Sequence, residues 1–110
     1  MKLKQLVSKR NFKTIVEGAS YVLPTYFFNK ETGQNEQVNE QLIDLLTFNS
    51  EGTVHEAILS MIIHDLQYKN GLVPSKETAW AITKLQEALM WLEERQRDRE
   101  IRNVQGTYTK

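Results

Sequence analysis

The chain has 110 residues, 14 basic and 14 acidic side chains, no cysteine and a hydrophobic fraction of 40%. This length predicts a single domain spanning residues 1–110, and the absence of cysteine excludes disulfides, thiolate metal sites and cysteine nucleophiles. Zero net charge argues against a protein that coats nucleic acid through its overall field, and no apolar run approaches the roughly 20 residues that cross a bilayer.

The opening segment of 13 residues carries five basic side chains and no acidic one. It suits either a basic surface strand or an arm that contacts anions. Its charges also interrupt any apolar run of the signal-peptide kind, so we expect a cytoplasmic protein with no membrane partner. A monomer of this size buries only about 65% of the surface that its unfolded chain exposes, which favours an oligomer.

Two strand-like stretches follow, at residues 14–16 and 21–28. They flank a short polar segment in which Gly18 suits a positive φ, as in a hairpin turn. Pro24 interrupts the second stretch, and because proline has no N–H it is expected at a sheet edge or a bulge.

A turn is predicted at residues 29–33, followed by a third short strand over 34–38. Asn39 is a favourable helix cap, and the apolar positions after it predict a short helix that ends before Gly52. We therefore expect a β-rich part at 1–38 and a helical part at 39–110. The apolar positions of the short helix are Leu42, Ile43, Leu45, Leu46 and Phe48.

The next helix is predicted to run from Thr53 to about Tyr68 and to end at Gly71 in the C′ role. Its main apolar stripe has helical spacing, while Leu59 and Ile63 form a second stripe outside that face. A helix that is apolar on two sides is buried on two sides, so we expect a second subunit to contact it. The main stripe consists of Val54, Ala57, Ile58, Met61, Ile62 and Leu66.

The last helix is predicted to begin after a Ser75 cap and to reach about Asn103, a length of roughly 40 Å. One apolar face is expected to pack on the preceding helix, and the charged turns after it to project beyond the core. That face contains Ile82, Leu85, Ala88, Leu89 and Leu92. The expected fold class is α+β, a small N-terminal antiparallel β-element followed by a long antiparallel α-helical hairpin over 53–104, in an oligomer.

The residue types that support catalysis form no catalytic pattern. His55 and His64 lie nine positions apart, on opposite faces of one helix, so they cannot share a metal ion. No HExxH, GxSxG or glycine-rich phosphate loop occurs. We expect a binding protein rather than an enzyme, with no catalytic residue, no metal and no cofactor.

Arginines at i, i+4 and i+7 mark the end of the last helix: Arg95, Arg99 and Arg102. Such a like-charge stripe costs a few tenths of a kcal/mol per pair, and a bound anion would relieve this cost because guanidinium groups match phosphate. The alternative is a solvated helix face held by two i,i+4 pairs, Glu93 with Arg97 and Asp98 with Arg102.

Two groups of aromatic side chains allow more than one interpretation. Tyr68 lies at the hairpin turn, near a helix N-terminus where Ser75 and Thr78 accompany unpaired backbone N–H groups. A nucleotide could bind there if the tyrosine ring stacked on its base while the backbone amides and an arginine bound its phosphate. Trp80 and Trp91 share a helix face, which favours a core or interface role over a base-stacking platform. Lys84, Glu87 and Arg95 lie on the same face.

The segment from Glu77 to Leu92, continued by the three arginines and the residues 104–107, resembles the C-terminal helical hairpin of two phage families. These families are the anti-CBASS sponges and the first Thoeris anti-defence family. The sequence at 21–29, followed by Glu31-Thr32-Gly33, is similar to the small β-region that the Thoeris branch adds.

The resemblance implies a phage anti-defence protein that binds and sequesters cyclic ADP-ribose isomers without cleaving them and so blocks the Thoeris effector. It also implies cyclic di- or trinucleotides of CBASS as a further ligand class at a second site. Homodimers or homohexamers with pockets between subunits, in the host bacterial cytoplasm during infection, follow from the same resemblance.

Carried over by position, the aromatic that stacks on the base falls on Tyr68, the polar residue inside the last helix on Thr78, and a phosphate-reading arginine on Arg95. Arg99 and Arg102 match further family arginines. The chain departs from the family pattern at residues 73–78, where Phe-x-Cys-Arg-Glu-Asn is frequent, and at Asn103 and Gln105, where glycine and glutamate are usual.

Two functions of other classes remain as alternatives. One is a helical oligomeric module for protein interaction, with solvated arginines. The other is a nucleic-acid-binding phage protein that uses the basic arm and the arginine helix, which predicts affinity that falls steeply with salt. Net neutrality argues against this second alternative.

Overall fold

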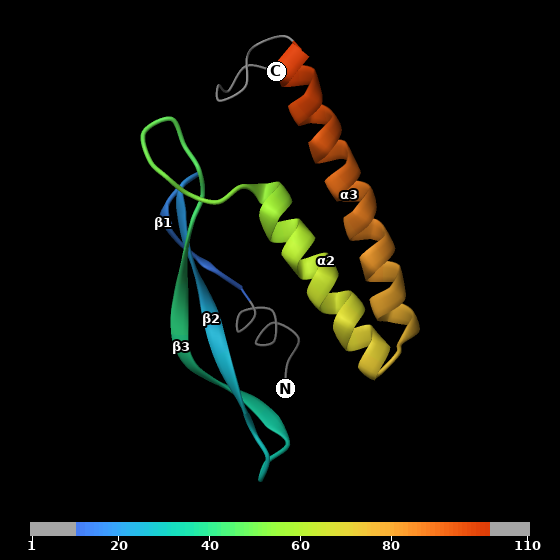
Figure 1. Cartoon of the computed structure of the whole chain (residues 1–110). Coiled ribbons are helices and arrows are strands. Elements are labelled where there is room, and N and C mark those ends of the chain that lie inside the picture. The colour runs from blue at the N-terminus through green and yellow to red at the C-terminus, as the bar shows by residue number, and fades with distance from the viewer. Residues whose placement is uncertain (1–10, 102–110) are drawn as a thin grey trace. The chain divides into compact units, whose positions relative to one another are not determined.

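The computed structural model describes residues 11–101, which form a three-stranded sheet and two helices (Figure 1). The elements are β1 (Lys13–Val16), β2 (Ser20–Asn29), β3 (Gln34–Asp44), α2 (His55–Leu72) and α3 (Lys76–Ile101). The chain divides into two compact units, Met1–Gly52 and Thr53–Lys110, hereafter the sheet unit and the hairpin unit. The α+β class and the antiparallel β-element are confirmed.

The sheet has the order β1-β2-β3, and both neighbouring pairs are antiparallel. The first turn contains Gly18 at φ 75°, as predicted, and its N–H donates to the Tyr21 hydroxyl at 2.8 Å. The second turn contains Gly33 at φ 72°, and its N–H donates to the Asn29 carbonyl at 2.8 Å. Both turns need a residue that tolerates positive φ, which glycine does at no steric cost.

Pro24 lies within β2, opposite Glu40 of β3. The strand β1 pairs with β2 only as far as Val22, so the part of β2 that contains Pro24 has a partner strand on one side only. A missing N–H is tolerated at such an edge, and the register shifts between Thr25 and Tyr26, one residue further on. The expected edge or bulge position of Pro24 is thus confirmed.

The short helix predicted after Asn39 is wrong, because β3 continues through this segment to Asp44. Asn39 pairs with Thr25, Leu42 with Val22, and Ile43 with Tyr21. The apolar pattern of residues 42–48 fits a helix locally, but pairing with the distant β2 outweighs a weak local preference. The β-rich part therefore extends beyond residue 38, and the chain then turns through an isolated bridge between Thr47 and Ser50.

Gly52 is fixed by a close approach between two backbone segments of the sheet unit. A Cβ atom added there would lie 2.2 Å from the carbonyl carbon of Leu45 and 2.5 Å from the nitrogen of Leu46. No side chain fits at that distance, so this position requires glycine.

The hairpin unit contains α2 and α3, which run antiparallel side by side (Figure 1). Gly71 does not end α2 as predicted, because the helix continues to Leu72 and the N–H of Val73 donates to the Lys69 carbonyl at 3.0 Å. Pro74 explains the stop, since the residue before a proline is driven out of the helical region. Val73 accordingly has φ −137° and ψ 87°.

The side of α2 that packs on α3 combines members of both predicted stripes. Ile63 of the second stripe is 7% exposed and Leu59 is half-buried, as are Ile58 and Leu66 of the main stripe. Met61 of the main stripe, in contrast, is 63% exposed. On α3 the predicted face is confirmed, with Ile82 buried and Leu85, Leu89 and Leu92 half-buried, while Ala88 is exposed. Periodicity alone could not identify the packed side of α2, because both sides are apolar.

Among residues 11–101, only Ile63 and Ile82 are buried apolar side chains. Many large apolar side chains of the same range are exposed, and they occur in both units. Neither helix of this described range has an apolar stretch sufficient to span a membrane.

Candidate ligand-binding site at the helical hairpin

The N-terminus of α3 is closed by a small network of hydroxyl groups. Ser75 caps the helix as predicted: its Oγ accepts a hydrogen bond from the Thr78 N–H at 3.1 Å and donates to Thr78 Oγ1 at 2.7 Å. The Ser75 N–H donates to Asn70 Oδ1 at 2.9 Å. The N–H groups of Lys76 and Glu77 have no carbonyl partner within the helix, so this end of α3 offers donors and a positive dipole end to an anion.

Tyr68 lies on the opposite side of α2 from α3. Its ring is 64% exposed, and it follows the half-buried Leu66 by two residues, which corresponds to about 200° around the helix. Thr78, in contrast, belongs to the half-buried stripe of α3. One hairpin therefore presents the tyrosine ring and the threonine hydroxyl on different sides.

The arginines lie far along α3 from its N-terminus. Arg95 is 17 residues beyond Thr78 in an uninterrupted helix, which corresponds to about 25 Å along the axis. Arg99 is a turn further on, and Arg102 lies outside the described residues. A single chain brings Ser75 and Thr78 together but does not bring them to the arginines.

The arginine-rich half of α3 carries one ion pair that the sequence pattern did not identify. Arg97 pairs with Glu94, three positions earlier, where the pattern suggested Glu93. Arg95 is exposed, whereas Arg99 is half-buried and its Nε atom is buried without a hydrogen-bond partner in the described range. Among Arg95, Arg97 and Arg99, it is Arg97 whose charge is paired with a carboxylate of the same helix, that of Glu94.

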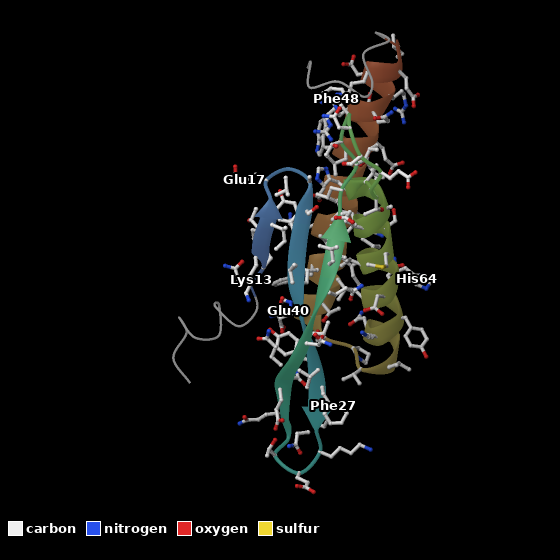
Figure 2. The ribbon with its side chains drawn as sticks, turned by 90° about the vertical axis from the view of Figure 1, so that its left-hand side faces the viewer. Lys13, Glu17, Phe27, Glu40, Phe48 and His64 are labelled. Atoms are coloured by element: carbon white, nitrogen blue, oxygen red, sulfur yellow. The ribbon has the colours of Figure 1, made fainter. Side chains whose placement is uncertain are left out.

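The two tryptophans are exposed rather than part of the core of this chain. Trp80 is 62% exposed, with the Lys76 ammonium 4.9 Å from its ring centre, and Trp91 is 68% exposed. His55 and His64 are also exposed, and Figure 2 shows His64 on the outside of α2. In the part of the chain that the structure describes, no three His, Asp or Glu side chains cluster as metal ligands would.

Sequence reasoning missed a small cavity at the edge of the sheet. It has a volume of about 90 Å³ and lies beside the ion pair of Lys13 and Glu40, whose Nζ and Oε1 atoms are 3.0 Å apart (Figure 2). Pockets for nucleotide-sized ligands have volumes of roughly 300–1,000 Å³, so this cavity is too small for one. No local pattern predicts it, because it forms only when β1, β2 and β3 pair.

Comparison with known proteins places the hairpin in a family. Residues 36–97 match the model of the Acb2/Tad1 hairpin domain. The chain is also 43% identical over 79 residues to Thoeris anti-defense 1 of Bacillus phage SBSphiJ7. That match covers 71% of this chain and 56% of the relative, so the chain spans little more than half the length of the relative.

The family match includes Tyr68, Ser75, Thr78 and Arg95 and ends before Arg99. It covers more than half of the 110 residues, and it confirms the resemblance on which the site residues were chosen. The chain belongs to the Acb2/Tad1 hairpin family.

Proposed function

We propose that this chain is a phage anti-defence protein that binds cyclic ADP-ribose isomers and sequesters them intact, which prevents activation of the Thoeris effector. The observation that carries the proposal is the match of its hairpin to the Acb2/Tad1 family, within which Tyr68, Ser75, Thr78 and Arg95 lie. The relative from Bacillus phage SBSphiJ7 is named Thoeris anti-defense 1, which supports the same assignment.

The chemistry of the hairpin supports binding without turnover. The Ser75 hydroxyl donates to the Thr78 hydroxyl and accepts from the Thr78 N–H. Neither of these hydrogen bonds involves a histidine or carboxylate that could act as a general base. Tyr68 presents an exposed ring for a base, and the end of α3 presents donors for phosphate. A dissociation constant near 1 nM, about −12 kcal/mol, would make such a binder an effective sponge without any catalytic step.

A complete site requires more than one copy of the chain. The distance of about 25 Å between Thr78 and Arg95 along α3 exceeds the size of a single pyrophosphate-linked nucleotide. Arginines from a second copy would supply the missing phosphate contacts. We therefore include a homodimer or a homohexamer in the proposed function.

Two finer points complete the proposal. The likeness to anti-CBASS sponges supports a second site that takes cyclic di- or trinucleotides. A protein that intercepts such signals would act in the host bacterial cytoplasm during infection.

The distinguishing experiment is recovery of the ligand. The full chain is incubated with a cyclic ADP-ribose isomer, freed of excess ligand and heated, and the released molecule is identified by chromatography and mass. Release of unchanged ligand is expected. A linear product would indicate a hydrolase, and failure to retain any nucleotide would favour a protein-interaction module.

Tyr68 provides the residue-level test. Tyr68→Ala should weaken binding by about 1–3 kcal/mol, the contribution of one base–aromatic stack, whereas Tyr68→Phe keeps the ring and should bind nearly as the parent does. Isothermal titration calorimetry measures both. Equal affinity of the alanine and phenylalanine variants would remove Tyr68 from the site.

A further inference from the structure

The second half of β2 has a neighbouring strand on one side only. The strand β1 pairs with β2 as far as Val22, whereas β2 continues to Asn29 beside β3. Figure 1 shows β2 and β3 continuing together beyond the end of β1. We call the side of residues 23–29 of β2 that faces away from β3 the ribbon edge. Such an edge is a template for pairing with another extended segment.

The backbone of β2 shows which of its groups point to the ribbon edge. Successive residues of a strand point their N–H and C=O groups to opposite sides. The carbonyl of Ala19 accepts a hydrogen bond from the residue after β3, at 2.6 Å, and that of Asn29 accepts one from the turn into β3, at 2.8 Å. The extra residue at the register shift, Val38, belongs to β3, so the alternation along β2 is unbroken. The carbonyls of Pro24 and Phe28 therefore face the ribbon edge.

The charges of the sheet unit are unbalanced in its described part. Residues 11–52 carry six acidic and two basic side chains, a net charge of −4. The ten residues before them carry four basic side chains and no acidic one, a net charge of +4. The opening segment and the sheet that follows it are thus complementary in charge, which favours their contact.

We propose that residues 6–10, which precede the described range, bind along the ribbon edge and continue the register of β1. In that register Lys13 lies opposite Val22 and Thr14 opposite Tyr21, so each step back along β1 is one step forward along β2. Residues 6–10 would lie opposite residues 25–29. Their backbone would donate to the carbonyls of the ribbon edge. The basic opening segment would then be a surface strand rather than an arm that contacts anions.

The continued register repeats an ion pair that the structure contains. The Lys13 ammonium crosses β2 to the Glu40 carboxylate of β3, two residue pairs further along β2, at 3.0 Å (Figure 2). Arg10 would have the same position relative to Glu36, which is again two residue pairs further along. Glu36 is exposed, and its Oε1 atom accepts a hydrogen bond from Asn29 at 2.8 Å. Its Oε2 atom would accept the guanidinium group.

The apolar residues of the segment match the exposed aromatic residues of β2. Val7 would lie directly opposite Phe28, and Leu6 would lie diagonally opposite Phe27 on the other face of the sheet. The two rings are 52% and 63% exposed. Cross-strand pairs of aromatic and β-branched side chains stabilise a sheet. One segment would therefore cover part of both rings, although they lie on opposite faces.

An introduced disulfide tests the register, because the chain has no cysteine of its own. Ser8→Cys with Phe27→Cys places two thiols at directly opposite positions, where the Cβ atoms come within the roughly 3.5–4.5 Å that a disulfide needs. Ser8→Cys with Glu36→Cys is the matched control. Glu36 is the partner of Phe27 on β3, so it lies at the same level but two strand spacings, about 10 Å, from residue 8.

The rate of disulfide closure is the measured quantity. The full-length variants are oxidised with glutathione at low protein concentration, the remaining thiols are alkylated, and mass spectrometry counts the chains with an intrachain disulfide. The pair with Phe27→Cys should close about tenfold faster than the pair with Glu36→Cys. Circular dichroism verifies that both variants retain their secondary structure.

Charge reversal tests the predicted ion pair in the same assay. Arg10→Glu, added to S8C/F27C, should slow closure about threefold, because an exposed attraction becomes a repulsion. Adding Glu36→Arg as well restores opposite charges and should restore the rate.

Four results would overturn the proposal. Equal rates for the two cysteine pairs would show that the segment does not bind the ribbon edge, and faster closure with Glu36→Cys would place it along β3. Disulfide-linked dimers as the main product of S8C/F27C would mean that another chain occupies the edge. Charge variants that leave the rate unchanged would refute the register. No nucleotide takes part in these measurements, so their outcome is independent of the proposed function.

Discussion

The two units of this chain differ in how their side chains are packed. In the sheet unit, no described residue is buried, and the adjacent Phe27 and Phe28 are 63% and 52% exposed although they lie on opposite faces of β2. The hairpin unit contains both buried side chains of the described range, Ile63 and Ile82. Because burial of apolar side chains stabilises a fold, we expect the hairpin unit to provide most of the stability that comes from side-chain packing.

The largest effect should come from the hairpin core. Ile63→Ala removes a side chain that is 7% exposed and should destabilise the chain by about 2–4 kcal/mol through lost burial and a residual cavity. Ile15→Ala makes the same chemical change in β1, at 60% exposure, and should cost about 0.5 kcal/mol or less. Urea denaturation measures the free energy of unfolding of both variants. Similar losses would contradict the conclusion that the two units differ in how much stability their side chains contribute.

Replacing two glycines by alanine should change the stability of the chain in opposite directions. Gly52→Ala should destabilise by about 1–3 kcal/mol, because its Cβ would meet the backbone of Leu45. Gly71→Ala lies within α2 with open space around the new Cβ and should stabilise by about 0.5–1 kcal/mol. Melting temperatures measure both changes, and a stabilising Gly52→Ala would show that the loop does not hold this conformation.

The helix cap should have a smaller effect than the hairpin core. Ser75→Ala removes the acceptor of the Thr78 N–H and should destabilise by about 1 kcal/mol. Ser75→Asp retains an acceptor beside the positive end of the helix dipole and should restore stability. If thermal unfolding of the alanine variant matched that of the parent, the cap would not contribute to the hairpin.

The hairpin was predictable from sequence because its signals are local. Apolar residues at helical spacing, a serine cap and Pro74 after the first helix lie within a few residues of the structure that they determine. The turns at Gly18 and Gly33 were predictable for the same reason, since each needs positive φ.

The segment after Asn39 was not predictable, because its structure depends on a partner that is distant in sequence. Leu42 and Ile43 fit a helix by spacing, yet they pair with Val22 and Tyr21, about 20 residues away. The packed side of α2 was predicted only in part, since it contains Ile58 and Leu66 of the main stripe together with Leu59 and Ile63 of the second. Both sides of α2 carry apolar residues, so either could be buried. The packing of α3 determines that the side with Ile63 is the buried one.

The site was predictable only in part. The Ser75 and Thr78 pair follows from local capping and is confirmed as a structural unit. The expectation that Tyr68 and Arg95 gather around the same hairpin end does not hold within one chain, because helix geometry separates them.

Native mass spectrometry of the full chain, with and without a cyclic ADP-ribose isomer, tests the central claim most directly. We expect an assembly with an even number of chains whose mass rises by that of the intact nucleotide. A single chain that carries no nucleotide, or a bound species heavier than the added signal by one water, would contradict the account.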